Sequence, residues 1–203
     1  MNWRAFGAVA AMVLAAPLVG QAQTTLTVRT YNNFGVSPED LSAARPHVEA
    51  VFHDAGIELS WVDCWYRDKE IAGTSAHCSE PLKANEVILR LQAANPLPGK
   101  RYVSMGFALV NIADGVPFLA TVYADLVRTV SRDAHLDFQL LLGRAIAHEI
   151  GHLLLDTNRH AESGLMRAGW SNAELRQNAQ RDWSFRSGEI EVIRSAAVTR
   201  NDR

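Results

Sequence analysis

The residues with the clearest chemistry are His148, Glu149 and His152, which form a His-Glu-x-x-His motif. Side chains at this spacing lie on one face of a helix, about one turn apart, so the two imidazoles can bind one metal ion. Glu149 can reach a metal-bound water without being a ligand itself. Zinc lowers the pKa of such a water toward neutrality, and a carboxylate can take its proton as the water attacks a carbonyl. The spacing therefore predicts a zinc site with hydrolytic chemistry.

The motif lies in a run from His135 to Leu155 that contains no proline and is apolar on most of a helical circumference. Such a helix is expected to be central and buried. Two imidazoles and a carboxylate are costly in that setting unless something binds them. Gly151 has no side chain and lets another segment of the chain approach closely. This context favours a metal-binding helix over a core helix with a polar stripe.

A catalytic zinc site usually takes three protein ligands and keeps a fourth position for water. His160 follows a stretch, residues 156–158, that can end the helix and turn the chain back toward the metal. Acidic residues are the alternatives: Glu174 on the next predicted helix, and Asp156 or Glu162 in the loop. We expect His160 to be the third ligand.

Residues 140–170 resemble the metzincin superfamily of zinc peptidases. In metzincins the zinc helix is followed by a third histidine and then by a tight turn that carries a methionine beneath the metal. His160 and the sequence Ser163-Gly164-Leu165-Met166 resemble these two features. The usual pattern continues x-x-Gly-x-x-His after the second histidine, whereas here Leu155 takes the place of the glycine and His160 comes two residues later.

The resemblance implies a site in which His148, His152 and His160 bind one zinc ion above Met166. Glu149 would act as general base on the zinc-bound water and then pass its proton to the leaving amine. The function implied is that of a zinc-dependent endopeptidase, and the N-terminal pattern described next indicates that it is exported. One alternative is a thermolysin-like site with Glu174 as third ligand. Another is a metzincin-like protein that binds zinc without significant peptidase activity.

The N-terminal residues have the pattern of a bacterial export signal. Arg4 precedes an apolar stretch, residues 6–19, and small residues surround a cleavage site after Ala22. The apolar stretch is too short to span a bilayer comfortably. We therefore expect a signal peptide over residues 1–22, a single domain over residues 23–203, and a secreted or periplasmic location without stable membrane insertion.

The net charge and the cysteine content indicate which classes of binding partner and which cellular compartment to expect. Lys and Arg number 20 and Asp and Glu number 22, a formal net charge of −2, which argues against a nucleic-acid or anionic-membrane partner. We expect a monomer that acts on polypeptides. Cys64 and Cys78 are the two cysteines. In an oxidising compartment they are expected to form a structural disulfide, which stabilises a loop of this size by about 3 kcal/mol.

The surrounding sequence predicts the elements that position the motif. Ser37 and Pro38 begin a helix that runs to about Asp54. Alternation and turn signals predict strands at residues 26–31, 57–62, 86–91, 104–111 and 118–123, and helices near residues 172–180 and 187–198. This order predicts an α+β fold: a small mixed twisted sheet, a backing helix, the buried zinc-binding helix and C-terminal helices. By the metzincin resemblance, a sheet edge near residues 116–121 would pair with substrate.

Overall fold

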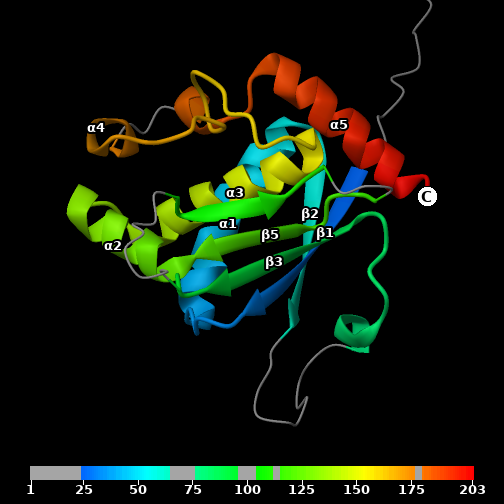
Figure 1. Cartoon of the computed structure of the whole chain (residues 1–203), viewed down its shortest axis with the longest axis horizontal. Coiled ribbons are helices and arrows are strands. Elements are labelled where there is room, and N and C mark those ends of the chain that lie inside the picture. Colours follow the sequence, from blue (N-terminus) through cyan, green and yellow to red (C-terminus); the bar gives the residue numbers. More distant parts are fainter. Residues whose placement is uncertain (1–23, 65–75, 96–103, 112–114, 177–179) are drawn as a thin grey trace, which may run out of the picture.

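The computed structural model describes residues 24–64, 76–95, 104–111, 115–176 and 180–203. The predicted signal peptide, residues 1–22, lies outside the described residues. Five strands form one sheet, and helices α1 (Pro38–Asp54) and α3 (Phe138–Leu155) pack against it (Figure 1). The buried apolar side chains form one hydrophobic cluster. Among the described residues, no helix is long and apolar enough to cross a membrane.

The sheet has the strand order β2-β1-β3-β5-β4. Its strands are β1 (Thr24–Asn32), β2 (Ile57–Cys64), β3 (Glu86–Gln92), β4 (Gly106–Leu109) and β5 (Leu119–Tyr123). Neighbouring strands are parallel except β4, which runs antiparallel to β5. The prediction that residues 116–121 form a sheet edge that could pair with substrate is therefore wrong. Strand β5 lies inside the sheet, and β4 forms the edge on this side. Strand order depends on contacts between distant segments, which local alternation does not specify.

Helix α1 follows the start signal in its sequence. Ser37 is the N-cap, its hydroxyl accepts a hydrogen bond from the Asp40 N–H, and Pro38 begins the helix. Gly56 follows the helix with a φ of 77°, a conformation that glycine adopts without strain. The buried side chains of α1 share one face of the helix: Leu41, Ala44, Val48, Val51 and Phe52. The prediction of this helix is confirmed at both ends.

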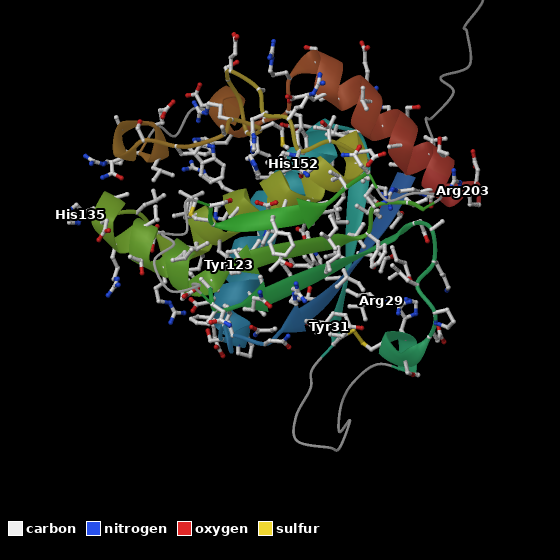
Figure 2. All side chains as sticks on the ribbon, viewed as in Figure 1. Arg29, Tyr31, Tyr123, His135, His152 and Arg203 are labelled. Atoms are coloured by element: carbon white, nitrogen blue, oxygen red, sulfur yellow. A yellow bond between two sulfur atoms is a disulfide. The ribbon has the colours of Figure 1, made fainter. Side chains whose placement is uncertain are left out.

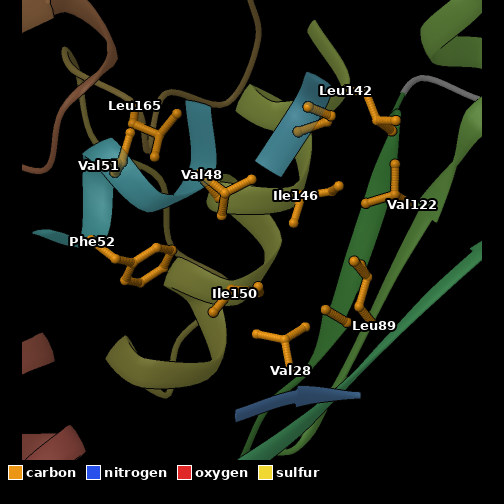
Figure 3. Packing of buried hydrophobic residues seen from close by; sticks show 14 of the residues in the cluster. Val28, Val48, Val51, Phe52, Leu89, Val122, Leu142, Ile146, Ile150 and Leu165 are labelled. Carbon is orange, nitrogen blue, oxygen red and sulfur yellow. The ribbon is translucent and has the colours of Figure 1, made fainter. Parts of the chain in front are cut away.

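Helix α3 lies in the middle of the core, as the apolar run predicts. Every residue from Leu141 to Leu154 is buried. Ile146 and Ile150 lie between α1 and the sheet residues Val28, Leu89 and Val122 (Figure 3). At Gly143 a Cβ atom would lie 2.8 Å from the carbonyl oxygen of Ala44, so α1 and α3 approach more closely there than a side chain would allow.

Two helical predictions need correction. The run from His135 forms one helix, α3, which begins only at Phe138, and a separate helix that the sequence did not predict, α2 (Ala124–Ala134), directly follows β5 and precedes the run. His135 ends α2 in the left-handed conformation and lies at the opposite end of the molecule from Arg203 (Figure 2). The helix expected over residues 172–180 ends early as α4 (Asn172–Leu175), and a 3₁₀ helix, η2 (Gln180–Trp183), precedes α5 (Ser187–Asn201).

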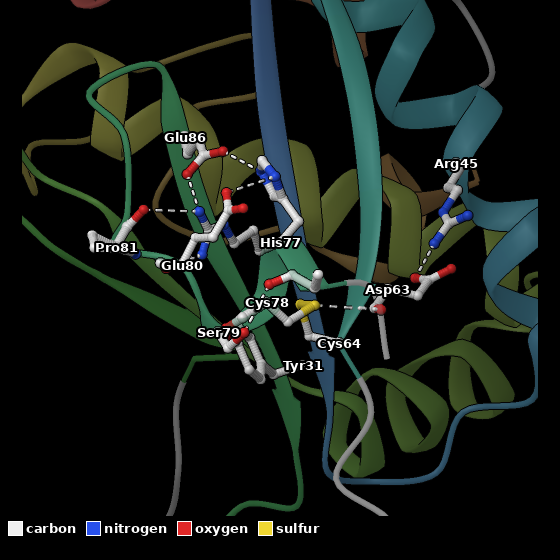
Figure 4. The surroundings of a disulfide bond; sticks show 12 residues. Tyr31, Arg45, Asp63, Cys64, His77, Cys78, Ser79, Glu80, Pro81 and Glu86 are labelled. Carbon is white, nitrogen blue, oxygen red and sulfur yellow. Dashed lines mark hydrogen bonds and ion pairs between the residues drawn. A yellow bond between two sulfur atoms is a disulfide. The ribbon is translucent and has the colours of Figure 1, made fainter. Parts of the chain in front are cut away.

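Cys64 and Cys78 form a disulfide, as the sequence predicts (Figure 4). It joins the end of β2 to the 3₁₀ helix η1 (Ala76–Ser79). Beside it, Arg29 and Glu86, each 2% exposed, form an ion pair, and Arg29 also donates to the carbonyl oxygen of Glu80 at 2.8 Å. The disulfide and this buried pair hold η1 against the sheet, far along the chain from the histidines.

Candidate metal centre

Three histidines come together at the C-terminal half of α3. Figure 2 labels one of them, His152. The possible ligand nitrogens of His148, His152 and His160 all lie within 4.8 Å of one another. The Nε2 atoms of His148 and His152 are 3.0 Å apart. In a tetrahedral zinc site, Zn–N distances of about 2.0–2.1 Å place neighbouring nitrogens about 3.3 Å apart. The three side chains therefore fit one zinc ion after small adjustments.

Backbone carbonyl groups orient two of the imidazoles. Nδ1 of His148 lies 2.9 Å from the carbonyl oxygen of Leu165, and Nδ1 of His152 lies 2.6 Å from that of Thr157. A ring that donates its Nδ1–H to a carbonyl has its lone pair on Nε2, where a metal ion can bind. These two contacts select the tautomer that presents both Nε2 atoms to the same point.

Burial favours the neutral form of all three imidazoles. Burial lowers the pKa of His148 to about 4, and it also lowers the pKa values of His152 and His160. Metal binding requires the neutral form of histidine, so the site does not have to lose protons at neutral pH to bind an ion.

A left-handed residue at the end of α3 brings His160 back to the helix. Asp156 has a φ of 45°, and its carboxylate accepts a hydrogen bond from the Asn111 N–H at 2.8 Å. The predicted exit at residues 156–158 is therefore confirmed, although Asp156 rather than Asn158 takes the left-handed conformation. The His160 ring lies 5.4 Å from that of His148 and 4.9 Å from that of His152, measured between centroids.

A tight turn closes the loop that carries His160. The Ala161 N–H donates to the Met166 carbonyl oxygen at 2.8 Å, and Gly164 has a φ of 80°. Met166 is buried against α3: a Cβ atom added at Gly151 would lie 2.8 Å from its Sδ. Gly151 thus permits the close approach that the sequence indicates. The placement of Met166 beneath a metal stays a prediction.

Glu149 lies between α3 and the edge strand β4. The side chain is 5% exposed, and its Oε2 has no hydrogen-bond partner among the described residues. Burial raises the pKa of Glu149 to about 8. A Cβ atom at Gly106 would lie 2.7 Å from Oε1 of Glu149 and 2.6 Å from the carbonyl oxygen of Thr121. Only glycine at this position of β4 leaves room for the carboxylate.

Gly106→Ala is expected to reduce the hydrolysis that the sequence predicts for this site by about a hundredfold, because a carboxylate displaced by about 1 Å loses its alignment with the reacting atoms. Zinc content should stay unchanged, since the atoms nearest to a Cβ at Gly106 belong to Thr121 and Glu149 and not to the histidines. The measurement is kcat/KM beside metal content. Gly188→Ala is the matched control, because nothing lies within 4 Å of a Cβ there. Equal activity of the two variants would contradict this placement of Glu149.

A small cavity of about 160 Å³ opens beside the histidines. His148, Glu149 and His160 line it together with residues of α2, of the segment before β4 and of residues 167–170. A larger cavity of about 540 Å³ lies between α5 and the segment before β5 and includes none of the histidines. The smaller cavity is therefore the one where a bound molecule would meet the candidate metal site.

The acidic alternatives for the third ligand lie elsewhere. Glu174 belongs to a capping box at α4, where its carboxylate accepts hydrogen bonds from Ser171, and it pairs with Arg167 at 3.2 Å. Asp156 accepts from Asn111, and Glu162 is exposed. Neither these residues nor any other carboxylate of the described chain joins the histidine cluster.

Sequence reasoning missed several residues around the site. The carbonyl groups of Thr157 and Leu165 orient the histidines, and Arg167 and Trp170 line the cavity. No sequence signal identifies these, because their positions depend on the turn and on packing. Gly106 did carry a signal, since an isolated glycine inside a strand often marks a close approach.

No family model matches this sequence, and no curated protein matches it. Solved structures do match. One is a zinc-dependent peptidase from Methanocorpusculum labreanum (strain Z), with a TM-score of 0.52 and 16% identity, covering 82% of this chain and 99% of that one. Another is archaemetzincin from Methanopyrus kandleri, with a TM-score of 0.50 and 16% identity, covering 88% and 98%.

The predicted fold class is thereby confirmed. The sheet of five strands, the helices packed against it and the central α3 form an α+β arrangement that also occurs in the archaemetzincin structure. The chain has a metzincin-like fold, and its cluster of His148, His152 and His160 is consistent with the His-Glu-x-x-His motif and distal histidine of metzincins.

Proposed function

We propose that this protein is a zinc-dependent endopeptidase in which His148, His152 and His160 bind one zinc ion. One observation carries the proposal: three imidazoles converge on one point, and Glu149, whose buried Oε2 has no hydrogen-bond partner among the described residues, lines the same cavity as His148 and His160. Imidazole nitrogen is a preferred ligand of zinc, and three such ligands leave a coordination position open. The likeness to proteins described as a zinc-dependent peptidase and an archaemetzincin supports the same reading.

Each residue of the site has a separate role in peptide hydrolysis. When bound, zinc supplies a Lewis acid that polarises a carbonyl and lowers the pKa of water. Glu149 accepts the proton of the attacking water on its free oxygen and then donates it to the leaving amine. The carbonyl groups of Thr157 and Leu165 keep the imidazoles of His152 and His148 in position.

The sheet edge next to α3 is suited to a polypeptide substrate. Strand β4 is the last strand on this side of the described sheet, and its Gly106 lies against Glu149. An extended peptide that adds to this edge would be held through its backbone, with limited discrimination between side chains. Such binding would present the peptide bond to Glu149. It therefore fits an endopeptidase.

We further propose that the protein is exported and acts as a monomer in the periplasm or outside the cell. The charged and apolar pattern of residues 1–22 supports export. The disulfide between Cys64 and Cys78 also supports it, because disulfides persist in oxidising compartments.

Metal removal tests the proposed function. The purified protein is expected to contain about one zinc ion per chain and to cleave casein. Treatment with a chelator should remove both the metal and the activity, and one equivalent of zinc, but not of magnesium, should restore them, because magnesium prefers oxygen ligands. Mass spectrometry of the metal and of the casein fragments gives both readouts. Stoichiometric zinc without cleavage would instead favour a zinc-binding protein, and cleavage that survives metal loss would refute the zinc mechanism.

A further inference from the structure

The turn at the end of α3 is made by an exposed residue with an uncommon backbone conformation. Asp156 is the C-cap of this helix, has a φ of 45°, and stands between His152 and His160 in the sequence. The left-handed conformation is costly for most L residues, whereas glycine, asparagine and aspartate adopt it more readily. Because the chain reverses here, the backbone of Asp156 determines whether His160 can reach the other two histidines.

The Asp156 side chain attaches this turn to the end of a strand. Its Oδ1 accepts a hydrogen bond from the Asn111 N–H at 2.8 Å. Asn111 follows shortly after β4, the edge strand along which we propose that substrate lies. The bond therefore joins the proposed substrate edge to the loop that carries His160.

The residue after Asp156 connects the turn to the metal ligands. The Thr157 N–H donates to the His152 carbonyl oxygen at 3.3 Å, and the Thr157 carbonyl oxygen lies 2.6 Å from Nδ1 of His152. The second of these contacts orients the imidazole for metal binding. A change in the direction of the chain at Asp156 would move this carbonyl group, and with it the segment that leads to His160.

The negative charge of Asp156 acts on a different group. Arg200 of α5 is 5% exposed, and it donates to the carbonyl oxygen of Pro117 at 2.5 Å and to that of Leu153 at 3.3 Å. Burial lowers the pKa of Arg200 to about 10, and the nearby charge of Asp156 opposes this shift. The charge therefore stabilises the cation that joins α5 to the last turn of α3. This contribution affects the stability of the fold and is separable from the hydrogen bond to Asn111.

We propose that Asp156 is a positioning residue of the zinc site: its left-handed backbone directs the chain toward His160, and its Oδ1, bonded to Asn111, fixes that direction. The inference rests on the proposed zinc site and adds a residue that acts through the histidines rather than on the reacting atoms. The glycine of the metzincin pattern could supply this backbone conformation but not the acceptor.

Three substitutions of Asp156 separate the conformation, the acceptor and the charge. Asp156→Asn and Asp156→Gly both remove the charge and both tolerate the left-handed conformation, but only asparagine keeps an acceptor. Zinc affinity, measured by competition with a zinc-binding dye, should stay close to that of the wild type in Asp156→Asn. It should fall about tenfold in Asp156→Gly, because loss of a group that supports a ligand costs about 10–100-fold. Asp156→Ala also disfavours the conformation, so its affinity should be the lowest.

Two further readouts distinguish positioning from a general effect on stability. The free energy of unfolding should fall in both Asp156→Asn and Asp156→Gly, since both remove the charge near Arg200. The absorption bands of bound Co²⁺, which report ligand geometry, should change only in the glycine and alanine variants. The matched control is His135→Gly, because His135 ends α2 in the same left-handed conformation and lies outside the histidine cluster. Its zinc affinity should equal that of the wild type.

Hydrogen exchange of the chelator-treated protein separates failure of this inference from failure of the proposed function. Without metal, the amides of residues 157–161 should exchange faster in Asp156→Gly than in the wild type, and Asp156→Asn should match the wild type. This pattern in a protein that binds no zinc would refute the zinc peptidase and retain the role of Asp156 in directing the loop. Equal exchange in all variants would overturn the inference. So would equal zinc affinity of Asp156→Asn and Asp156→Gly in a protein that does bind zinc, whether or not it cleaves peptides.

Discussion

Glu149→Gln is expected to abolish peptide hydrolysis and leave zinc binding intact. Glutamine has nearly the shape of glutamate, so it should fit the space between α3 and Gly106 that the carboxylate occupies. It cannot accept the proton of the attacking water. General base catalysis contributes about 10²–10⁴-fold to such rates, so kcat should fall by about a thousandfold or more. The measurement is kcat on a casein-derived peptide beside zinc content.

The control for this prediction is Glu162→Gln, at an exposed position in the loop that carries His160. It removes the same charge from the same region and should retain activity. Circular dichroism of both variants establishes that each is folded. Full hydrolysis by folded, zinc-loaded Glu149→Gln would show that another group acts as the base.

His160→Ala is expected to weaken zinc binding more than any change to the acidic residues near the site. His160 supplies the third imidazole of the cluster, whereas Glu174 is bonded to Ser171 and Arg167. Loss of a group that only supports a ligand costs about 10–100-fold in metal affinity, so loss of a ligand should cost at least about a hundredfold. Affinity is measured by competition with a zinc-binding dye.

Glu174→Gln is the matched variant, and its zinc affinity should equal that of the wild type. The reverse result, in which zinc affinity falls for Glu174→Gln and persists for His160→Ala, would indicate a thermolysin-like ligand set. Comparable losses of zinc affinity in both variants would mean that the segments carrying His160 and Glu174 both move when the ion binds.

The parts of the site that follow from short spacings could be predicted from the sequence. His148 and His152 need only a helix to share a face, and the apolar run provides that helix. His160 required a turn of unusual length. The left-handed Asp156 that makes this turn is held by the backbone of Asn111, a contact over 45 residues that no local pattern specifies.

The features of the fold that the sequence did not predict also have physical causes. Helix α2 follows β5 without a glycine or proline, its N-cap Tyr123 makes no side-chain capping bond, and its left-handed final cap is His135 rather than glycine. Signals for helix ends were therefore absent on both sides. The edge position of β4 reflects the pairing of whole strands, and Arg167 and Trp170 line the cavity only after residues 167–170 pack beside α3.

The loop between Thr157 and Leu165 has a consequence for the speed of metal binding. Its two end carbonyls orient His152 and His148, and it contains His160 between them. The Leu165 N–H is itself bonded to the carbonyl oxygen of Ser184. The conformational entropy of this loop is thus lost when the chain folds and not when the ion arrives. Zinc should consequently enter a preorganised site, with association limited by diffusion and dehydration rather than by rearrangement of the protein.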